Sequence, residues 1–115
     1  MDYSQLSDQE INMLVAKIQH PDKNFIESKT RPPSVVLLNH INNWVDYCNN
    51  WSDGGPIIVS NQISLMYEEA IGKWCAGKPY WVDGCEWQLD IDVMEANPLR
   101  SAMIFFLIMQ DANHV

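Results

Sequence analysis

The feature that most constrains the fold is an apolar segment near the C-terminus, where "NPLRSAMIFFLIM" occupies residues 97–109. Asn97 followed by Pro98 is a typical helix start, because asparagine caps free backbone N–H groups and proline fits the first helical position. The residues over 102–109 are apolar almost all round. Since a helix that is hydrophobic on every side has to lie inside a protein, the sequence predicts a helix over 98–110 at the buried centre of the fold.

A second helix is predicted near the N-terminus, over residues 8–19. Ser7 and Glu10 form the S-x-x-E pattern of a capping box, in which each side chain bonds the backbone of the other residue. Pro21 sets the end, because the residue before a proline is driven out of the helical conformation. The apolar residues between these signals share one face of the helix: Ile11, Leu14, Val15 and Ile18.

Strand patterns fill the region between the two helices. Extended or β-favouring runs occur at 24–27, 35–38, 44–48, 62–67, 73–76 and 80–82. From Glu86 onward polar residues alternate with four apolar ones, Trp87, Leu89, Ile91 and Val93. The whole pattern predicts an α+β fold, one small domain over residues 1–115 in which antiparallel strands pack against an N-terminal and a buried C-terminal helix.

The charge of the chain restricts its partners. There are 7 basic and 15 acidic residues, a net charge of −8, which argues against binding to nucleic-acid phosphates or to anionic membranes. Five acids and no basic residue lie within 83–95: Asp83, Glu86, Asp90, Asp92 and Glu95. Tryptophan is frequent at protein interfaces, and Trp81 and Trp87 lie beside these acids. We therefore predict that Trp81, Trp87, Asp90 and Asp92 belong to a surface that contacts a partner protein.

The polar stretch "NNWSDGGPII" at 49–58 allows two interpretations. A structural interpretation makes it a turn in which Ser52 or Asp53 caps a short helical turn and Pro56 lies near the start of that turn. In that case we expect three apolar residues to anchor the loop in the core: Trp51, Ile57 and Ile58. A functional interpretation treats Cys48, Ser52 or Asp53 as reactive. The phosphate-binding motifs are absent, which favours the structural interpretation.

No metal or cofactor site is predicted. The three cysteines, Cys48, Cys75 and Cys85, have no C-x-x-C spacing, and no histidine lies near Cys75 or Cys85. Asp90 and Asp92 share a strand face, but acids on a solvated strand face are common, so we interpret them as surface residues. The first residues show no secretory signal, which predicts a cytoplasmic protein in which Cys48 and Cys75 are reduced, buried thiols.

Several blocks of the chain resemble one family. "MDYSQLSDQEIN", "DYCNNWSDGGPII" followed by "ISL", "WCA" and "NPLRSAMIFFLIM" resemble, in order and spacing, the NinX-like family of small phage and prophage proteins. These blocks cover about half of the chain. The resemblance implies a phage origin and an intracellular setting in a bacterial host, and it implies no particular chemistry.

Three functional hypotheses follow. The first is a non-enzymatic phage accessory protein that contacts a host or phage protein in the bacterial cytoplasm. The second is a small-ligand-binding or enzymatic module built around the loop 48–56. The third is an acidic mimic of nucleic acid, the weakest of the three because 15 acids in 115 residues do not form dense carboxylate rows.

Overall fold

The computed structural model describes residues 1–38, 43–84 and 86–113 and confirms the α+β class. In chain order the elements are η1 (Tyr3–Gln5), α1 (Asp8–Gln19), β1 (Phe25–Glu27), β2 (Val35–Leu37), β3 (Trp44–Val45), α2 (Trp51–Asn61), β4 (Ser64–Glu68), β5 (Lys73–Val82), β6 (Glu86–Glu95) and α3 (Pro98–Ala112).

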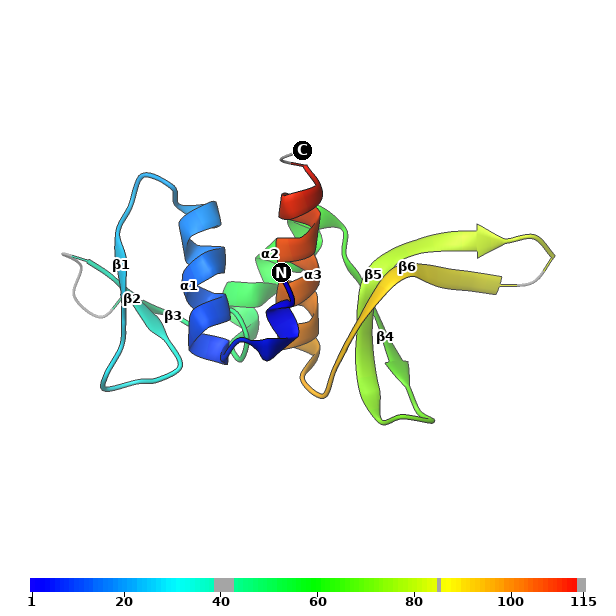
Figure 1. Ribbon diagram of the computed structural model, residues 1–115, viewed down its shortest axis with the longest axis horizontal. Coiled ribbons are helices and arrows are strands. Elements are labelled where there is room, and N and C mark those ends of the chain that lie inside the picture. The colour runs from blue at the N-terminus through cyan, green and yellow to red at the C-terminus, as the bar shows by residue number, and fades with distance from the viewer. Residues whose placement is uncertain (39–42, 85, 114–115) are drawn as a thin grey trace.

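The α-helices stand between two antiparallel sheets. One sheet has the strand order β1-β2-β3 and the other β4-β5-β6 (Figure 1). The molecule measures 54 × 32 × 25 Å, and its radius of gyration of 15.0 Å exceeds the value of about 13 Å for a compact chain of this length. Much of the extra length comes from the far halves of β5 and β6, which project away from the helices (Figure 1).

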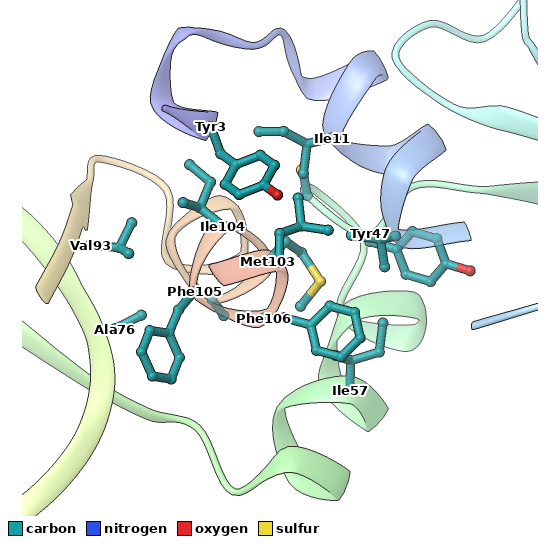
Figure 2. Close-up of a cluster of buried hydrophobic side chains, with 14 of the residues drawn as sticks. Tyr3, Ile11, Tyr47, Ile57, Ala76, Val93, Met103, Ile104, Phe105 and Phe106 are labelled. Atoms are coloured by element: carbon teal, nitrogen blue, oxygen red, sulfur yellow. The ribbon is translucent and has the colours of Figure 1, made fainter. Parts of the chain in front are cut away.

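Helix α3 forms the centre of the core, as its composition predicts. Residues 101–107 are all buried, with α1 and α2 on one side and β5 and β6 on the other. Phe105 points toward Ala76 and Val93 of the sheet, whereas Phe106 points toward Ile57 of α2 (Figure 2). The helix begins at Pro98 as predicted and runs two residues past the expected end, to Ala112.

Helix α1 has the predicted bounds and the predicted capping box. The Ser7 hydroxyl accepts a bond from the Glu10 N–H at 3.1 Å, and a Glu10 carboxylate oxygen accepts one from the Ser7 N–H at 3.0 Å. Ile11 and Val15 are fully buried, whereas Ile18 in the last turn is exposed. The apolar stripe therefore packs on the core over the first turns of α1 but not over its last.

Two expected strands in the second half of the chain, 73–76 and 80–82, form the single ten-residue strand β5. Pro79 does not interrupt the strand, although it has no N–H to give to a neighbour. The pairing of β4 with β5 ends at Ser64 and Gly77, so Pro79 pairs only with Leu89 of β6. A proline is tolerated where one side of a strand needs no donor.

The predicted strand over 44–48 is shorter in the structure. β3 includes only Trp44–Val45, and residues from Asp46 to Asn49 form a turn. The turn is closed by a bond from the Asn50 N–H to the Asp46 carbonyl at 2.9 Å. The hairpin of β2 with β3 is present as expected.

The pairing of β5 with β6 changes register once. Ala76 pairs with Val93, but the next pair is Lys78 with Asp90, so Gly77 alone faces two residues of β6. An extra residue of this kind is a β-bulge, and it reverses the alternation of side chains along the strand that carries it.

The bulge corrects one part of the sequence interpretation. The apolar residues of 86–93 were expected to share one face of the strand. In the structure Val93 faces α3, whereas the register places Trp87 and Leu89 on the opposite face of the sheet. The strand itself is confirmed, but its outer half turns its apolar side away from the core.

Candidate functional site

The polar stretch around residue 50 begins helix α2, which corrects the expected loop. Asn50, not Ser52 or Asp53, is the N-cap: its extended backbone precedes the helix and its side-chain oxygen accepts a bond from the Ser52 N–H at 2.9 Å. Asparagine is among the best capping residues, and position 50 places it just before the helical backbone. Pro56 lies inside the eleven-residue helix rather than near its start, on an exposed position.

Asp53 serves another structural purpose. Its Oδ2 accepts a bond from the Asp46 N–H at 3.0 Å, which ties the first turn of α2 to the preceding turn. The two segments are very close here, because a Cβ placed on Gly54 would lie 2.5 Å from the Tyr47 carbonyl oxygen. Glycine at this position allows that close approach.

Two of the three expected anchors of this stretch are correct. Ile57 is buried, and Ile58 is half-buried and packs against the core. Trp51 was expected to point inward, but 55% of it is exposed. It is the first residue of α2, immediately after the cap, and its position on the helix directs it to solvent.

Asn12 of α1 is a residue that the sequence interpretation missed. It is fully buried and makes three hydrogen bonds. Its amide donates to the Pro33 carbonyl at 3.0 Å and to Asp46 Oδ1 at 2.8 Å, and its oxygen accepts from the Cys48 N–H at 3.1 Å. The one sequence signal is a polar residue next to the apolar stripe of an amphipathic helix, which does not identify its partners.

Asn97 and Arg100 extend this network to the start of α3. The Asn97 amide donates to the Cys48 carbonyl at 2.7 Å, while its oxygen caps the helix through the Leu99 N–H at 2.9 Å. Arg100 pairs with Asp8 at 2.7 Å and with Glu95 at 2.5 Å. Burial alone would lower the pKa of Arg100, but its bonds with the two carboxylates outweigh that effect and raise the pKa.

These residues form one cluster, the polar junction, which joins α1, the turn before α2, the first turn of α2, β6 and α3. Its members are Asp8, Asn12, Asp46, Cys48, Asn49, Asp53, Glu95, Asn97 and Arg100. Each has at least one hydrogen bond to another segment or within the turn. Among the described residues no buried side-chain nitrogen or oxygen lacks a partner. The junction therefore uses its polar groups to hold segments together.

The thiol of Cys48 is poorly suited to act as a nucleophile. Cys48 is buried, and burial raises the pKa of its thiol. The nearby carboxylates of Asp8 and Asp46 raise the pKa further. The thiol therefore stays protonated at neutral pH, while the thiolate is the reactive form.

Tyr47, the neighbour of Cys48, also has a raised pKa. Burial, with a smaller contribution from Asp53, raises the pKa of the Tyr47 hydroxyl to about 12.

The other predicted surface has a different character. Trp81 and Trp87 pair directly across β5 and β6 in the projecting part of the hairpin, which we call the arm (residues 78–84 and 86–90). Their rings meet edge to face, with centroids 5.4 Å apart and planes at 69°. Although they pack on each other, 52% of Trp81 and 63% of Trp87 are exposed. Both rings are therefore largely open to solvent, and the predicted contact of these two residues with a partner stays a prediction.

A groove continues this apolar surface toward the base of the sheet. It has a volume of about 420 Å³ and lies on the face of the β4–β6 sheet that points away from α3. The register explains its position: Met66, Cys75 and Met94 are neighbours across the three strands on that face. The groove is lined by Met66, Glu68, Ile71, Cys75, Glu86, Trp87, Gln88, Leu89 and Met94.

The acidic residues of 83–95 divide among different environments. Asp83 and Glu86 are exposed on the arm, whereas Glu95 is paired with Arg100 in the polar junction. Asp90 and Asp92 belong to β6, and their side chains lie outside the described part of the structure. No group of three or more His, Cys, Asp or Glu side chains is placed to hold a metal ion within residues 1–38, 43–84 and 86–113.

The family comparison covers nearly the whole chain. The family model described as "Bacteriophage P22, NinX" matches residues 2–110, a range that includes both the polar junction and the arm. Neither the search of curated proteins nor that of solved structures finds a match. In the described segments, none of the helices has the length and apolar character needed to cross a membrane.

Proposed function

The chain belongs to the bacteriophage P22 NinX family, and we propose that this phage accessory protein works by binding another protein through the arm and its groove. The partner is a host or phage protein in the cytoplasm of the bacterial host, and the protein catalyses no reaction. The observation that carries the proposal is the exposed pair Trp81 and Trp87 beside the groove.

The distribution of exposed apolar side chains supports this surface. More than half of the exposed large hydrophobic residues in the described part of the chain belong to the β4–β6 sheet and its turns: Met66, Tyr67, Ile71, Tyr80, Trp81, Trp87 and Met94. Of these, Met66, Trp81, Trp87 and Met94 lie on the face of the sheet that points away from α3, whereas Tyr67 and Tyr80 lie on the other face. Exposed apolar side chains gathered on one face are typical of a binding site, because covering them with a partner is favourable. Tryptophan in particular contributes much of the binding energy at protein interfaces.

The alternative site, the loop 48–56, has weaker support. The Asp53 side chain is engaged in the polar junction and the Asn50 side chain caps α2, while Cys48 is buried and has a raised pKa. A reactive site needs accessible groups poised for a substrate. Trp51 at the edge of that segment is exposed, but within residues 1–38, 43–84 and 86–113 its ring packs on no other aromatic ring.

Site-specific photo-crosslinking in phage-infected cells tests the proposal. A photoreactive phenylalanine analogue replaces Trp87 in one variant and Trp51, which is similarly exposed, in the matched control. We expect a discrete crosslinked partner from position 87 that the Trp81→Ala change weakens. An equal yield from position 51, or a yield from 87 that Trp81→Ala leaves unchanged, would contradict a contact through the arm.

A further inference from the structure

The floor of the groove is apolar and adaptable. Met66 and Met94 lie on either side of Cys75, and Leu89 and Trp87 continue the same face along the arm. Ile71, in the turn after β4, adds a further apolar side chain. Figure 1 shows β4 and the arm diverging from the base of β5, and the lining residues of the groove come from both of them and from β5. Methionine fits irregular shapes, which suits a floor that receives another protein's side chains.

The rim of the groove is acidic. Glu68 of β4 lies on the groove face and is exposed. Glu86 lines the groove from the edge strand β6 and is also exposed, while its carboxylate accepts a bond from the Gln88 amide at 3.0 Å. Glu69 follows in the turn, and Asp83 is exposed at the end of the arm. Lys73 stands opposite Glu68 in the β4–β5 ladder and offsets part of this charge.

Lys78, a second basic residue near the groove, is hydrogen-bonded elsewhere in the protein. Lys78 begins the arm, but its ammonium group donates to the carbonyls of Asn61 and, at 3.0 Å, of Gln62 at the end of α2. It thereby neutralises the negative end of that helix rather than the acids of the arm. The acids that line the groove therefore lie near the exposed ring of Trp87, and an indole ring also attracts cations. Arg31, 4.0 Å from the ring centre of Trp44, shows the same kind of contact elsewhere in this chain.

We propose, building on the function proposed above, that the groove binds a protein segment that carries lysine or arginine next to large apolar side chains. The apolar side chains cover the methionine floor and Trp87, while the cations face Glu68 and Glu86. A second copy of this chain is a poor occupant, because a net charge of −8 would bring like charges together at the groove. The same charge disfavours a nucleic acid.

Selection from a random-peptide display library tests this chemistry directly. The library is passed over the Trp87→Ala variant first, to remove peptides that bind elsewhere, and then over the unaltered protein. We expect the retained peptides to be enriched in lysine or arginine beside leucine, isoleucine, phenylalanine or tryptophan. Enrichment of acidic or uncharged peptides, or no enrichment at all, would overturn the inference.

The place of binding is checked with methyl-labelled methionines by nuclear magnetic resonance. A selected peptide should shift the methyl signals of Met66 and Met94, while the buried Met103 serves as the internal control. The double variant Glu68→Gln/Glu86→Gln should weaken binding about five- to ten-fold, the size expected for two exposed charges. Asp22→Asn/Glu27→Gln removes two exposed acids from the other side of the chain and should change affinity less than about two-fold.

The outcomes separate this inference from the proposed function. If Trp87 captures a partner in cells but selected peptides are not basic, the arm remains the contact surface and the occupant inferred here is wrong. If the protein self-associates in sedimentation experiments and Glu68→Gln/Glu86→Gln strengthens that association, the groove binds a second copy instead. Shifts at Met66 and Met94 that appear equally with both double variants would also refute the charge argument.

Discussion

The polar junction and the arm differ in which of their side chains are open to solvent and which are engaged within the protein. The junction contains the residues that usually attract attention as catalytic candidates, and the structure uses them as partners for one another. The arm instead exposes the paired Trp81 and Trp87, and Trp87 lines a groove. Within this molecule, a dense polar sequence therefore marks a joint between segments, and the surface that we propose as the binding site is mainly apolar.

The physical reason is the free-energy cost of a polar group buried without a hydrogen-bond partner, compared with that of an apolar side chain exposed to water. A buried polar group without a partner destabilises the fold by about 1–3 kcal/mol, so the junction has to satisfy its members internally. An apolar side chain in water also costs free energy, but the cost is recovered only when something covers it. Satisfied polar groups are consequently poor evidence for a site, and exposed aromatic pairs are better evidence.

The largest expected effect concerns α3, which supports both regions. Phe105→Ala should reduce the free energy of unfolding by about 3–5 kcal/mol, as for other buried aromatic truncations, because the ring fills the space between α3 and the base of the sheet. Urea denaturation measures it. A loss below ~1 kcal/mol would show that the sheet does not depend on this helix.

The next effect belongs to the polar junction. Asn12→Ala should cost about 2–3 kcal/mol, because it leaves the Cys48 N–H and the Pro33 carbonyl without their buried partner. Asn49→Ala is the matched control, since Asn49 makes its bonds on the exposed side of the same network and should cost much less. Equal losses in urea denaturation would mean that burial does not set the strength of these bonds.

Much of the fold could be predicted from the sequence because its signals are local. The capping box at Ser7 and the asparagine–proline start of α3 identify the helices within the chain segments that carry them. Strand positions follow from alternation in the same way. The choice between Asn50 and Ser52 as a cap was missed, because several capping residues stand in a row and only the backbone selects one.

The sequence pattern could not predict features that depend on contacts between segments far apart in the chain. The bulge opposite Gly77 depends on how two strands pair, and it decides that Val93 and Trp87 face opposite sides of the sheet. The contacts of Asn12 and Arg100 join segments 34 and 92 residues apart. Of the candidate site residues, Trp81 and Trp87 were chosen because they flank an acidic segment, whereas their direct pairing follows from the register of β5 with β6.

A smaller effect separates the true cap of α2 from its neighbours. Asn50→Ala should lower the free energy of unfolding by about 1 kcal/mol, because it removes the acceptor of the Ser52 N–H. Ser52→Ala, one step inside the helix on an exposed position, should change it by less than about 0.5 kcal/mol. Thermal melts of the two variants decide between them. A larger loss for Ser52→Ala would restore the interpretation in which Ser52 is the cap.

The smallest effect on stability is expected in the arm, and it is the sharpest test of the comparison. Trp87→Ala should change the free energy of unfolding by only about 0.5–1 kcal/mol, since the exposed ring loses little more than its edge-to-face contact with Trp81. A double-mutant cycle with Trp81→Ala in urea denaturation isolates that contact, and the double variant should cost little more than either single one. Partner capture by the arm should nevertheless fall sharply in both single variants, because tryptophans buried at an interface contribute much of its binding energy.

If Trp87→Ala instead destabilises the protein by more than about 2 kcal/mol, the tryptophan pair stabilises the hairpin like a small core. The arm would then be a structural element like the junction, and the contrast between the two regions would be lost.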